Sequence, residues 1–247
     1  MPALVLVVTG LVLYANSLQG PFVYDDQFAI VENPNILQLW PLSQSLSAPD
    51  EAPVAGRPVV CLSLAINYAL GGMEVVGYHL FNIVIHILCS LVLLGVVRRT
   101  LLSDKLRPFF EPAAQGLAFV CALLWLVHPV QSECVNYITQ RTESMMALFY
   151  LLTLYCLIRA RDSTRPRLWQ VSCVAACSLG MACKESMVTA PFMIFVYDMV
   201  FLSGSLRVAV ARRKVLYAGL ASTWILLGWL MTGGPRSESV GFATQVS

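Results

Sequence analysis

Long apolar runs separated by short polar stretches dominate the pattern of the chain. A hydrocarbon core about 30 Å thick is crossed by about 20 helical residues, so runs near that length indicate membrane-spanning helices. We expect seven spans, at residues 3–15, 78–97, 113–127, 145–158, 168–183, 187–202 and 215–232. The pattern therefore predicts an all-α, polytopic membrane protein.

Three of the apolar runs need a specific interpretation. The run at 3–15 is short, but it lacks the basic segment and the cleavage site of a signal peptide, so we interpret it as the first span. The run at 145–158 is expected to be the apolar part of a helix that begins near Val135. Residues 59–70 are too few to cross a membrane and are followed by two glycines, which indicates a re-entrant or interfacial helix.

Lys184 and Glu185 divide residues 168–202 into two spans. A single helix of that length would extend about 50 Å, far beyond the hydrocarbon core. It would also place both charges near the membrane centre, at a cost of about 3 kcal/mol each. We therefore expect a tight turn at Lys184.

The distribution of charge predicts the orientation. Seven spans place three basic loops on one side: Arg98, Arg99, Lys105 and Arg107; Arg159, Arg161, Arg165 and Arg167; and Arg207, Arg212, Arg213 and Lys214. Short loops rich in Lys and Arg face the cytoplasm, so this side is predicted to be cytoplasmic. The other side receives most of the acidic residues, and its basic residues are Arg57, Arg141, Lys184 and Arg236.

Composition agrees with a membrane protein. Hydrophobic residues make up 57% of the chain and charged residues 12%, whereas a soluble domain has about 25% charged residues. Membrane lipids are therefore predicted partners. The net charge of +2 and the lack of a basic run with interleaved aromatic residues argue against a nucleic-acid partner. The eight cysteines form no Cys-X-X-Cys pair, so the sequence suggests neither a zinc site nor a redox motif.

Arg57, Arg141 and Lys184 lie next to predicted membrane boundaries on the non-cytoplasmic side. A cation there can bind an anion such as a lipid phosphate. The alternative is pairing with neighbouring acids: Arg141 with Glu143 or Glu133, and Lys184 with Glu185. Both interpretations stay open at this point.

Asp25 and Asp26 follow the first span and the segment Phe22-Val23-Tyr24. A carboxylate at a membrane surface can act as a general base or ligate a metal, and a pair can divide the roles of base and orienting group. The alternative is a helix cap or a turn, because Asp is common in both.

Other polar residues occur near the same predicted boundary. His79, Asn82 and His86 share one face of a helix, which predicts either a cavity lining or hydrogen bonds between helices, and their spacing is not diagnostic of a metal site. His128, Glu133 and Glu143 flank the turn between two later spans, where they would recognise a polar substrate or form a solvated loop.

Several of these motifs, in this order, resemble the transmembrane and tetratricopeptide-repeat O-mannosyltransferases. The resemblance covers nearly the whole chain and rests on these segments: 16–26 through Asn33-Pro34, Arg57-Pro58, Tyr78-His79-Leu80-Phe81-Asn82 with His86, 128–133, Arg141-Thr142-Glu143, Lys184-Glu185-Ser186 and Tyr197-Asp198. It implies a glycosyltransferase of the GT-C fold. Such an enzyme would move mannose from dolichyl-phosphate mannose to a Ser or Thr hydroxyl of an acceptor protein outside the cytoplasm.

The resemblance also implies roles for individual residues. Asp25 or Asp26 would be the catalytic base, and Arg57, Arg141 and Lys184 would bind the donor phosphate. Substrate-binding candidates are His79, His128, Glu133, Glu143 and Glu185. No metal ligand is assigned, although a divalent metal stays open as a cofactor beside the lipid-phosphate sugar donor.

The chain departs from the family pattern because it contains no tetratricopeptide repeats and because more membrane helices are expected after the seventh. We therefore interpret residues 1–247 as a single membrane domain, the N-terminal part of a longer GT-C module, with residues 16–57 as its first outer loop. The expected location is the endoplasmic reticulum membrane in a eukaryote and the inner membrane in a bacterium. The alternative functions are a non-catalytic membrane scaffold or truncated form, and a transporter, which would instead place polar residues through the middle of several spans.

Overall fold

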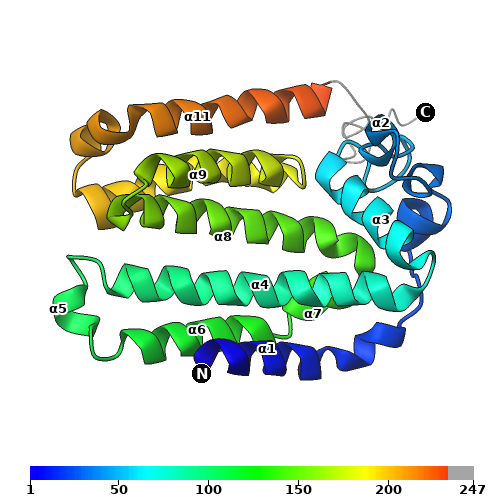
Figure 1. Cartoon of the computed structure of the whole chain (residues 1–247), viewed down its shortest axis with the longest axis horizontal. Helices are drawn as coiled ribbons and strands as arrows, with labels where there is room; N and C mark the ends of the chain where they lie inside the picture. The colour runs from blue at the N-terminus through cyan, green and yellow to red at the C-terminus, as the bar shows by residue number, and fades with distance from the viewer. Residues whose placement is uncertain (233–247) are drawn as a thin grey trace, which may run out of the picture.

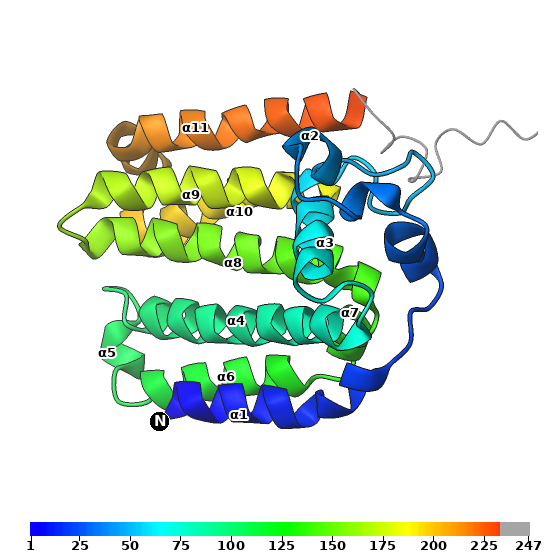
Figure 2. The same cartoon turned by 45° about the vertical axis from the view of Figure 1, so that its right-hand side comes forward.

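A computed structural model describes residues 1–232, and every regular element in them is helical. The helices that form the bundle run side by side along the longest axis of the molecule (Figures 1 and 2). They are α1 (Pro2–Leu13), α4 (Val75–Leu101), α6 (Ala114–Val127), α8 (Arg141–Asp162), α9 (Pro166–Met181), α10 (Ala190–Tyr197) and α11 (Leu206–Thr232). The prediction of an all-α fold is confirmed.

The remaining elements of the described chain connect these helices. They are α2 (Leu42–Ser45), α3 (Pro58–Gly71), α5 (Arg107–Phe110) and α7 (Gln131–Asn136), with the single turns η1 (Ala15–Gln19), η2 (Gln27–Val31), η3 (Pro34–Ile36), η4 (Ile138–Gln140), η5 (Glu185–Thr189) and η6 (Asp198–Ser203). Proline begins several helices, including Pro58 in α3 and Pro166 in α9. Proline is tolerated there because the backbone N–H that it lacks would have no partner within the first helical turn. Gly72, with φ of 59°, ends α3 in a conformation that favours glycine.

Four helical segments of the described chain are long and apolar enough to cross a membrane: Val75–Leu101, Ile138–Asp162, Glu185–Ser203 and Leu206–Thr232. Pro2–Leu13, Pro58–Gly71 and Ala114–Val127 are apolar but shorter. The prediction of a polytopic membrane protein is thus confirmed, whereas the number of seven spans stays a prediction. The expected break at Lys184 is present, because α9 ends at Met181 and η5 follows.

The helix predicted to begin near Val135 begins at Arg141 instead. Two short elements, α7 and η4, precede it and are separated by Tyr137, whose backbone is extended. The backbone N–H of Thr139 donates to the carboxylate of Asp26 rather than to a helical carbonyl. This long-range contact accounts for the later start.

The bundle is held together by apolar clusters between neighbouring helices. One cluster joins α1, α4 and α6, and another joins α8, α9, α10 and α11. Gly10 shows how closely α1 approaches α4, because a Cβ added there would lie 2.6 Å from Cγ1 of Ile87. Helix α4 lies between α6 and α8 in both views of the bundle (Figures 1 and 2).

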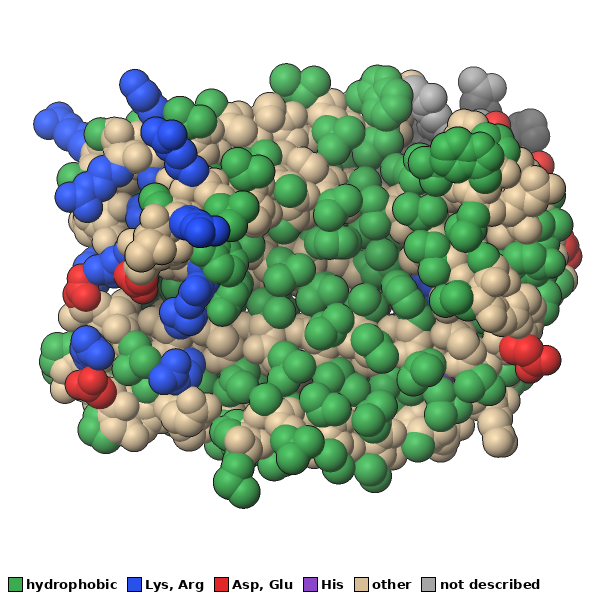
Figure 3. All heavy atoms as spheres, viewed as in Figure 1, with side chains coloured by type: hydrophobic (Ala, Val, Ile, Leu, Met, Phe, Trp, Pro, Cys, Tyr) green, Lys and Arg blue, Asp and Glu red, His purple; other side chains and the backbone are tan. Residues whose placement is uncertain are grey.

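Lys and Arg side chains gather at one end of the bundle, which we call the basic end (Figure 3). The α5 segment, the α8–α9 turn and the start of α11 all lie at this end (Figure 1). The three basic loops identified in the sequence are therefore on the same side of the bundle. We call the opposite end, formed by residues 15–57, α3, α7 and η5, the loop end.

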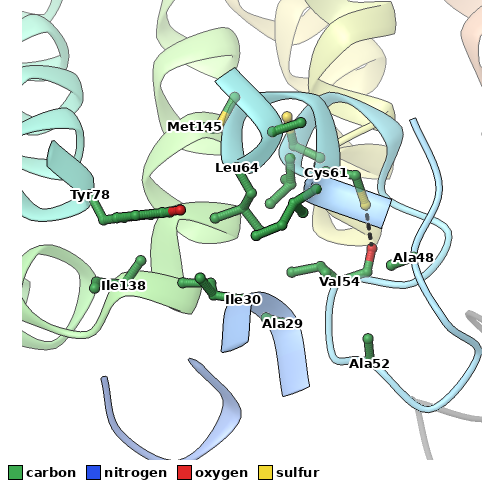
Figure 4. Packing of buried hydrophobic residues seen from close by; sticks show 14 of the residues in the cluster. Ala29, Ile30, Ala48, Ala52, Val54, Cys61, Leu64, Tyr78, Ile138 and Met145 are labelled. Carbon is green, nitrogen blue, oxygen red and sulfur yellow. Dashed lines mark hydrogen bonds between the residues drawn. The ribbon is translucent and has the colours of Figure 1, made fainter. Parts of the chain in front are cut away.

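Residues 16–57 fold into a compact layer over the loop end, although they contain little regular structure. Helix α3, predicted to be a re-entrant or interfacial helix, crosses the direction of the long helices there (Figure 2). Buried residues such as Ile30, Val54 and Leu64 pack beside Tyr78 and Ile138 (Figure 4). The thiol of Cys61 donates to the carbonyl oxygen of Val54 at 3.3 Å and closes this layer onto α3.

Candidate functional site

The two adjacent aspartates at the loop end have different environments. Asp26 is fully buried, and its carboxylate accepts from Val23 N at 3.1 Å and from Thr139 N and Oγ1 at 2.8 and 2.5 Å. Asp25 is exposed, and its backbone N–H donates to the Tyr137 hydroxyl at 2.9 Å. Asp26 therefore joins residues 22–31 to the segment before α8, while the Asp25 carboxylate is accessible.

Tyr24 and Tyr137 flank Asp25. Tyr24 has φ of 48°, a conformation that is costly for a bulky side chain, and it is 85% exposed. Its ring lies edge-on to that of Tyr137, with 6.4 Å between centroids. Burial is the largest cause that raises the pKa of Tyr137 to about 12. The hydrogen bond from the Asp25 backbone N–H lowers this pKa, whereas the hydrogen bond to the Asp25 carboxylate and the negative charge of that carboxylate raise it. The phenol is thus a neutral hydrogen-bonding group at physiological pH.

Arg141, a predicted donor-phosphate residue, is completely buried at the start of α8. Its guanidinium donates to Asn67 Oδ1 at 2.7 Å, to Tyr78 O at 3.2 Å and to Ser63 Oγ at 3.3 Å. The Phe81 ring centroid lies 4.6 Å from its central carbon, which adds a cation–π contact. No carboxylate of the described residues pairs with it, so the predicted pairing with Glu143 or Glu133 is not formed.

The other two predicted donor-phosphate residues form ion pairs that cross between elements. Lys184 pairs with Glu143 rather than with its neighbour Glu185. Glu185 instead forms an ion pair with Arg57, with 3.6 Å between the charged atoms. Arg57 also donates to the carbonyl oxygen of Pro53 at 2.7 Å. The two pairs connect η5 to α8 and to the start of α3.

Two of the predicted substrate-binding residues line one polar pocket of about 320 Å³ between α4, α6, α7 and α8. Glu133 and Glu143 contribute carboxylates, Gln131 and Gln140 contribute amides, and Trp125 contributes an aromatic face. Glu143 is also the partner of Lys184, so a cation lies beside the pocket.

Two further side chains of this pocket, His86 and Cys134, have defined environments. His86 stacks on Trp125 with 4.6 Å between ring centroids and bonds to the Leu126 carbonyl oxygen at 3.0 Å. Cys134 also lines the pocket, and burial raises the pKa of its thiol, with the charges of Glu143 and Glu133 adding to the effect. The thiol therefore stays protonated.

The remaining predicted residues lie outside this pocket. His79 and Asn82 are buried and bond to backbone carbonyl oxygens of other segments, His79 to Gly20 at 3.0 Å and Asn82 to Ile138 at 3.3 Å. With His86 they confirm the expected shared helix face and the hydrogen bonds between segments. His128 is exposed, and its Nδ1 accepts from the Val130 N–H at 3.3 Å.

The charge and metal-binding capacity of the site can be judged from residues 1–232. Within them, no group of three or more His, Cys, Asp or Glu side chains is placed to hold a metal ion. The charged groups instead pair with each other at the surface of the loop end.

Sequence reasoning missed several residues that build the site. Tyr137 contacts Asp25 and Thr139 contacts Asp26. Asn67 accepts the shortest hydrogen bond that Arg141 donates. Asn67 offered a readable signal, because it is a polar residue within the apolar run at 59–70. Tyr137 and Thr139 offered none, because their role comes from contacts with residues more than 100 positions away.

The fold and the site define the class of protein: a polytopic α-helical membrane protein with paired charges and a polar pocket at one end. Residues 51–231 match the family described as dolichyl-phosphate-mannose-protein mannosyltransferase, and the chain belongs to this family. The matched region includes Arg57, Arg141 and Lys184, while Asp25 and Asp26 precede it. The predicted resemblance to membrane-bound O-mannosyltransferases is confirmed.

Relatives of known name agree with the family. The chain is 31% identical to the Mus musculus protein O-mannosyl-transferase TMTC4 over 84% of this chain and 30% of that protein. It is 32% identical to the Homo sapiens protein O-mannosyl-transferase TMTC4 over 91% of this chain and 32% of that protein. The Homo sapiens protein O-mannosyl-transferase TMTC1 is 31% identical over 77% of this chain and 22% of that protein.

The chain spans about a third or less of the length of these relatives. No solved structure matches it. The GT-C fold therefore stays a prediction.

Proposed function

We propose that the protein transfers a sugar from a polyprenyl-phosphate carrier to a Ser or Thr hydroxyl of an acceptor protein. The proposed sugar is mannose, because the family is one of mannosyltransferases. The family match and the printed names of the relatives support the reaction class. The gathering of basic residues at one end supports a cytoplasmic basic end and a site on the opposite face. In a eukaryotic cell this orientation directs the site to the lumen of the endoplasmic reticulum.

The observation that carries the mechanism is the exposed Asp25 beside the buried Asp26. A hydroxyl nucleophile needs a base within hydrogen-bond reach, and the Asp25 carboxylate is accessible to one. The acceptor oxygen attacks the anomeric carbon, Asp25 takes the hydroxyl proton, and the bond from carbon to phosphate oxygen breaks. In this proposal the displacement is a single step with inversion at the anomeric carbon.

The leaving group is a lipid phosphate, which already carries charge and needs a cation more than an acid. Lys184 and Arg57 are partly exposed at the loop end, and each holds a carboxylate partner that a phosphate can replace or share. We assign the donor phosphate to these two residues. Arg141 has no exposed surface, so in this proposal it holds α3, α4 and α8 together below the site.

The polar pocket is the proposed position of the donor sugar. Its volume of about 320 Å³ lies at the small end of ligand pockets. Carboxylates and amides from Glu133, Glu143 and Gln140 can bind sugar hydroxyls, and Trp125 offers a face for the C–H side of the ring. His79, His128 and Glu185 stay substrate-binding predictions, and His79 contributes through Gly20 of the first loop.

A non-catalytic scaffold is the second candidate function. It would share the fold and the ion pairs but would not need an accessible carboxylate. An assay distinguishes the scaffold from an enzyme: purified membranes are tested for mannose transfer from polyprenyl-phosphate mannose to a Ser- or Thr-containing peptide. Transfer by the unaltered protein supports the proposal, and its absence at saturating donor and acceptor supports the scaffold.

The donor assignment has its own test in the same assay. Lys184→Ala should raise the KM for the lipid donor about tenfold, because a charged hydrogen bond to phosphate is lost. The peptide KM should not change. Lys214→Ala removes the same charge at the basic end and is the matched control. An unchanged donor KM in Lys184→Ala would contradict the phosphate role.

A further inference from the structure

A second pocket lies at the other end of the bundle, remote from the charged residues of the loop end. It is a groove of about 570 Å³ between α9 and α11. Arg167, Gln170, Val171 and Val174 line it from α9, and Val215 and Gly219 line it from α11. A Cβ added at Gly219 would lie 2.9 Å from Val174 Cγ2, so the glycine allows the two helices to approach at the bottom of the groove.

The groove is apolar along the helices and basic at one end. Val171 and Val215 are 67% and 75% exposed, so both present apolar surface at the groove. Arg167 lines the groove near the start of α9. Three more exposed cations are close in sequence: Arg165 immediately before α9, and Arg212 and Lys214 on α11. Within residues 1–232, none of these four cations has a carboxylate within ion-pair distance.

This combination matches the two parts of one type of molecule. An acyl chain fits a narrow apolar groove that faces lipid, and an anionic headgroup fits unpaired cations at the membrane surface. Juxtamembrane Lys and Arg attract anionic lipids in the cytoplasmic leaflet. A neighbouring transmembrane helix would also cover the valines, but it would leave Arg167 and its neighbours without a counter-charge.

We propose that the groove between α9 and α11 binds an anionic glycerophospholipid, with an acyl chain along Val171, Val174 and Val215 and the headgroup phosphate on Arg167. The site is structural and separate from the sugar-transfer site. It would stabilise the packing of α11 on α9 from the cytoplasmic leaflet. The inference does not depend on the proposed transfer activity.

The test is native mass spectrometry of the purified protein in detergent. Phosphatidylglycerol or phosphatidylcholine with the same acyl chains is added at equal concentration, and the fraction of lipid-bound protein is measured. The expected result is one phosphatidylglycerol retained per chain, with phosphatidylcholine retained less. Arg167→Ala should weaken phosphatidylglycerol binding about fivefold, the usual effect of one basic residue at a membrane surface.

Matched variants separate this site from general charge attraction. Arg207→Ala removes an exposed cation of α11 that does not line the groove, and it should leave lipid retention unchanged. Ala175→Leu fills the groove and should reduce retention, whereas Ala218→Leu adds the same bulk outside it and should not.

Three outcomes would overturn the proposal. Equal retention of the two lipids would show that the groove does not recognise the headgroup charge. An equal loss in Arg167→Ala and Arg207→Ala would reduce the effect to net charge. A dimer that Ala175→Leu disrupts while lipid retention stays unchanged would assign the groove to a helix of a second copy.

Discussion

At the scale of single residues, Asp25 and Asp26 show how neighbouring carboxylates acquire different tasks. Asp26 is buried and accepts three hydrogen bonds, two of them from Thr139. Asp25 keeps an exposed side chain and is held through its backbone N–H by Tyr137. Different environments of two nearby acids are a common basis for separate roles in catalysis. Here they separate a positioning residue, Asp26, from the proposed base, Asp25.

This division predicts that a substitution at Asp26 lowers stability, whereas a substitution at Asp25 lowers activity and leaves stability unchanged. Asp26→Asn should lower the free energy of unfolding by about 2 kcal/mol, because hydrogen bonds to a charged group are lost or weakened. Asp25→Asn should leave thermal unfolding unchanged, because its side chain is exposed. Thermal unfolding of the two variants in the same detergent compares them directly. A larger loss of stability in Asp25→Asn would contradict the division.

The sequence predicted which residues of the loop end carry charge but not how they pair. Arg57, Lys184 and Glu185 were singled out as charged residues near predicted membrane boundaries, and the structure brings them together at the loop end. Neighbour pairing of Lys184 with Glu185 was wrong, since Lys184 pairs with Glu143, 41 positions away. Such pairs depend on helix packing, which local spacing does not encode. The catalytic and binding roles of the predicted residues stay predictions.

At the scale of elements, α8 shows why one helix start was missed. Apolar periodicity continues back toward Val135, but Tyr137 is extended and Thr139 donates to Asp26. A tertiary hydrogen bond therefore overrides local helix preference before Arg141. The break between α9 and α10 was predictable, because two charges within an apolar run are costly at the membrane centre.

Helix α11 is fixed to the turn η6 by a buried ion pair that the sequence did not reveal. Asp198 is fully buried and accepts from Arg213 Nη1 at 2.6 and 2.7 Å, from Ser203 Oγ at 2.7 Å and from the Tyr217 hydroxyl. The backbone of Arg213 leaves the helical conformation, with φ of −132° and ψ of 30°. The bend of α11 thus coincides with the residue that reaches Asp198.

Breaking this pair should destabilise the packing of α11. Asp198→Asn should cost about 3–5 kcal/mol, because it leaves the Arg213 cation buried without a counter-charge. Arg213→Gln added to that variant should recover much of the loss. A double-mutant cycle of thermal unfolding measures the coupling. Additive effects of the two substitutions would show that the pair contributes no coupling energy.

At the scale of the whole molecule, the asymmetry of charge organises the protein. Basic residues gather at one end (Figure 3). The segments of the loop end and the start of α8 contain Asp25, Asp26, Glu133, Glu143 and Glu185. The sequence predicted this asymmetry because short loops alternate between the two sides of a membrane. It could not predict the layer formed by residues 16–57, whose core depends on contacts with α3, α4 and α8.

The orientation can be tested with N-glycosylation sites, because the chain contains no Asn-X-Ser/Thr acceptor of its own. Acceptors placed near residue 50 should be glycosylated in a eukaryotic cell. Acceptors placed at residues 102–106 or 163–165 should not be, because those loops carry basic residues. Gel mobility before and after glycosidase treatment reports the result. Glycosylation at the basic loops would reverse the proposed topology.

The most direct test of the central claim is the initial rate of mannose transfer from polyprenyl-phosphate mannose to a Ser- or Thr-containing peptide, measured for the unaltered protein and for Asp25→Asn. Asp25→Asn keeps the shape of the side chain and removes the base, so the rate should fall by about 10²–10⁴-fold while membrane insertion and thermal unfolding stay the same. Transfer by Asp25→Asn within twofold of the unaltered protein would contradict the assignment of Asp25 as the base.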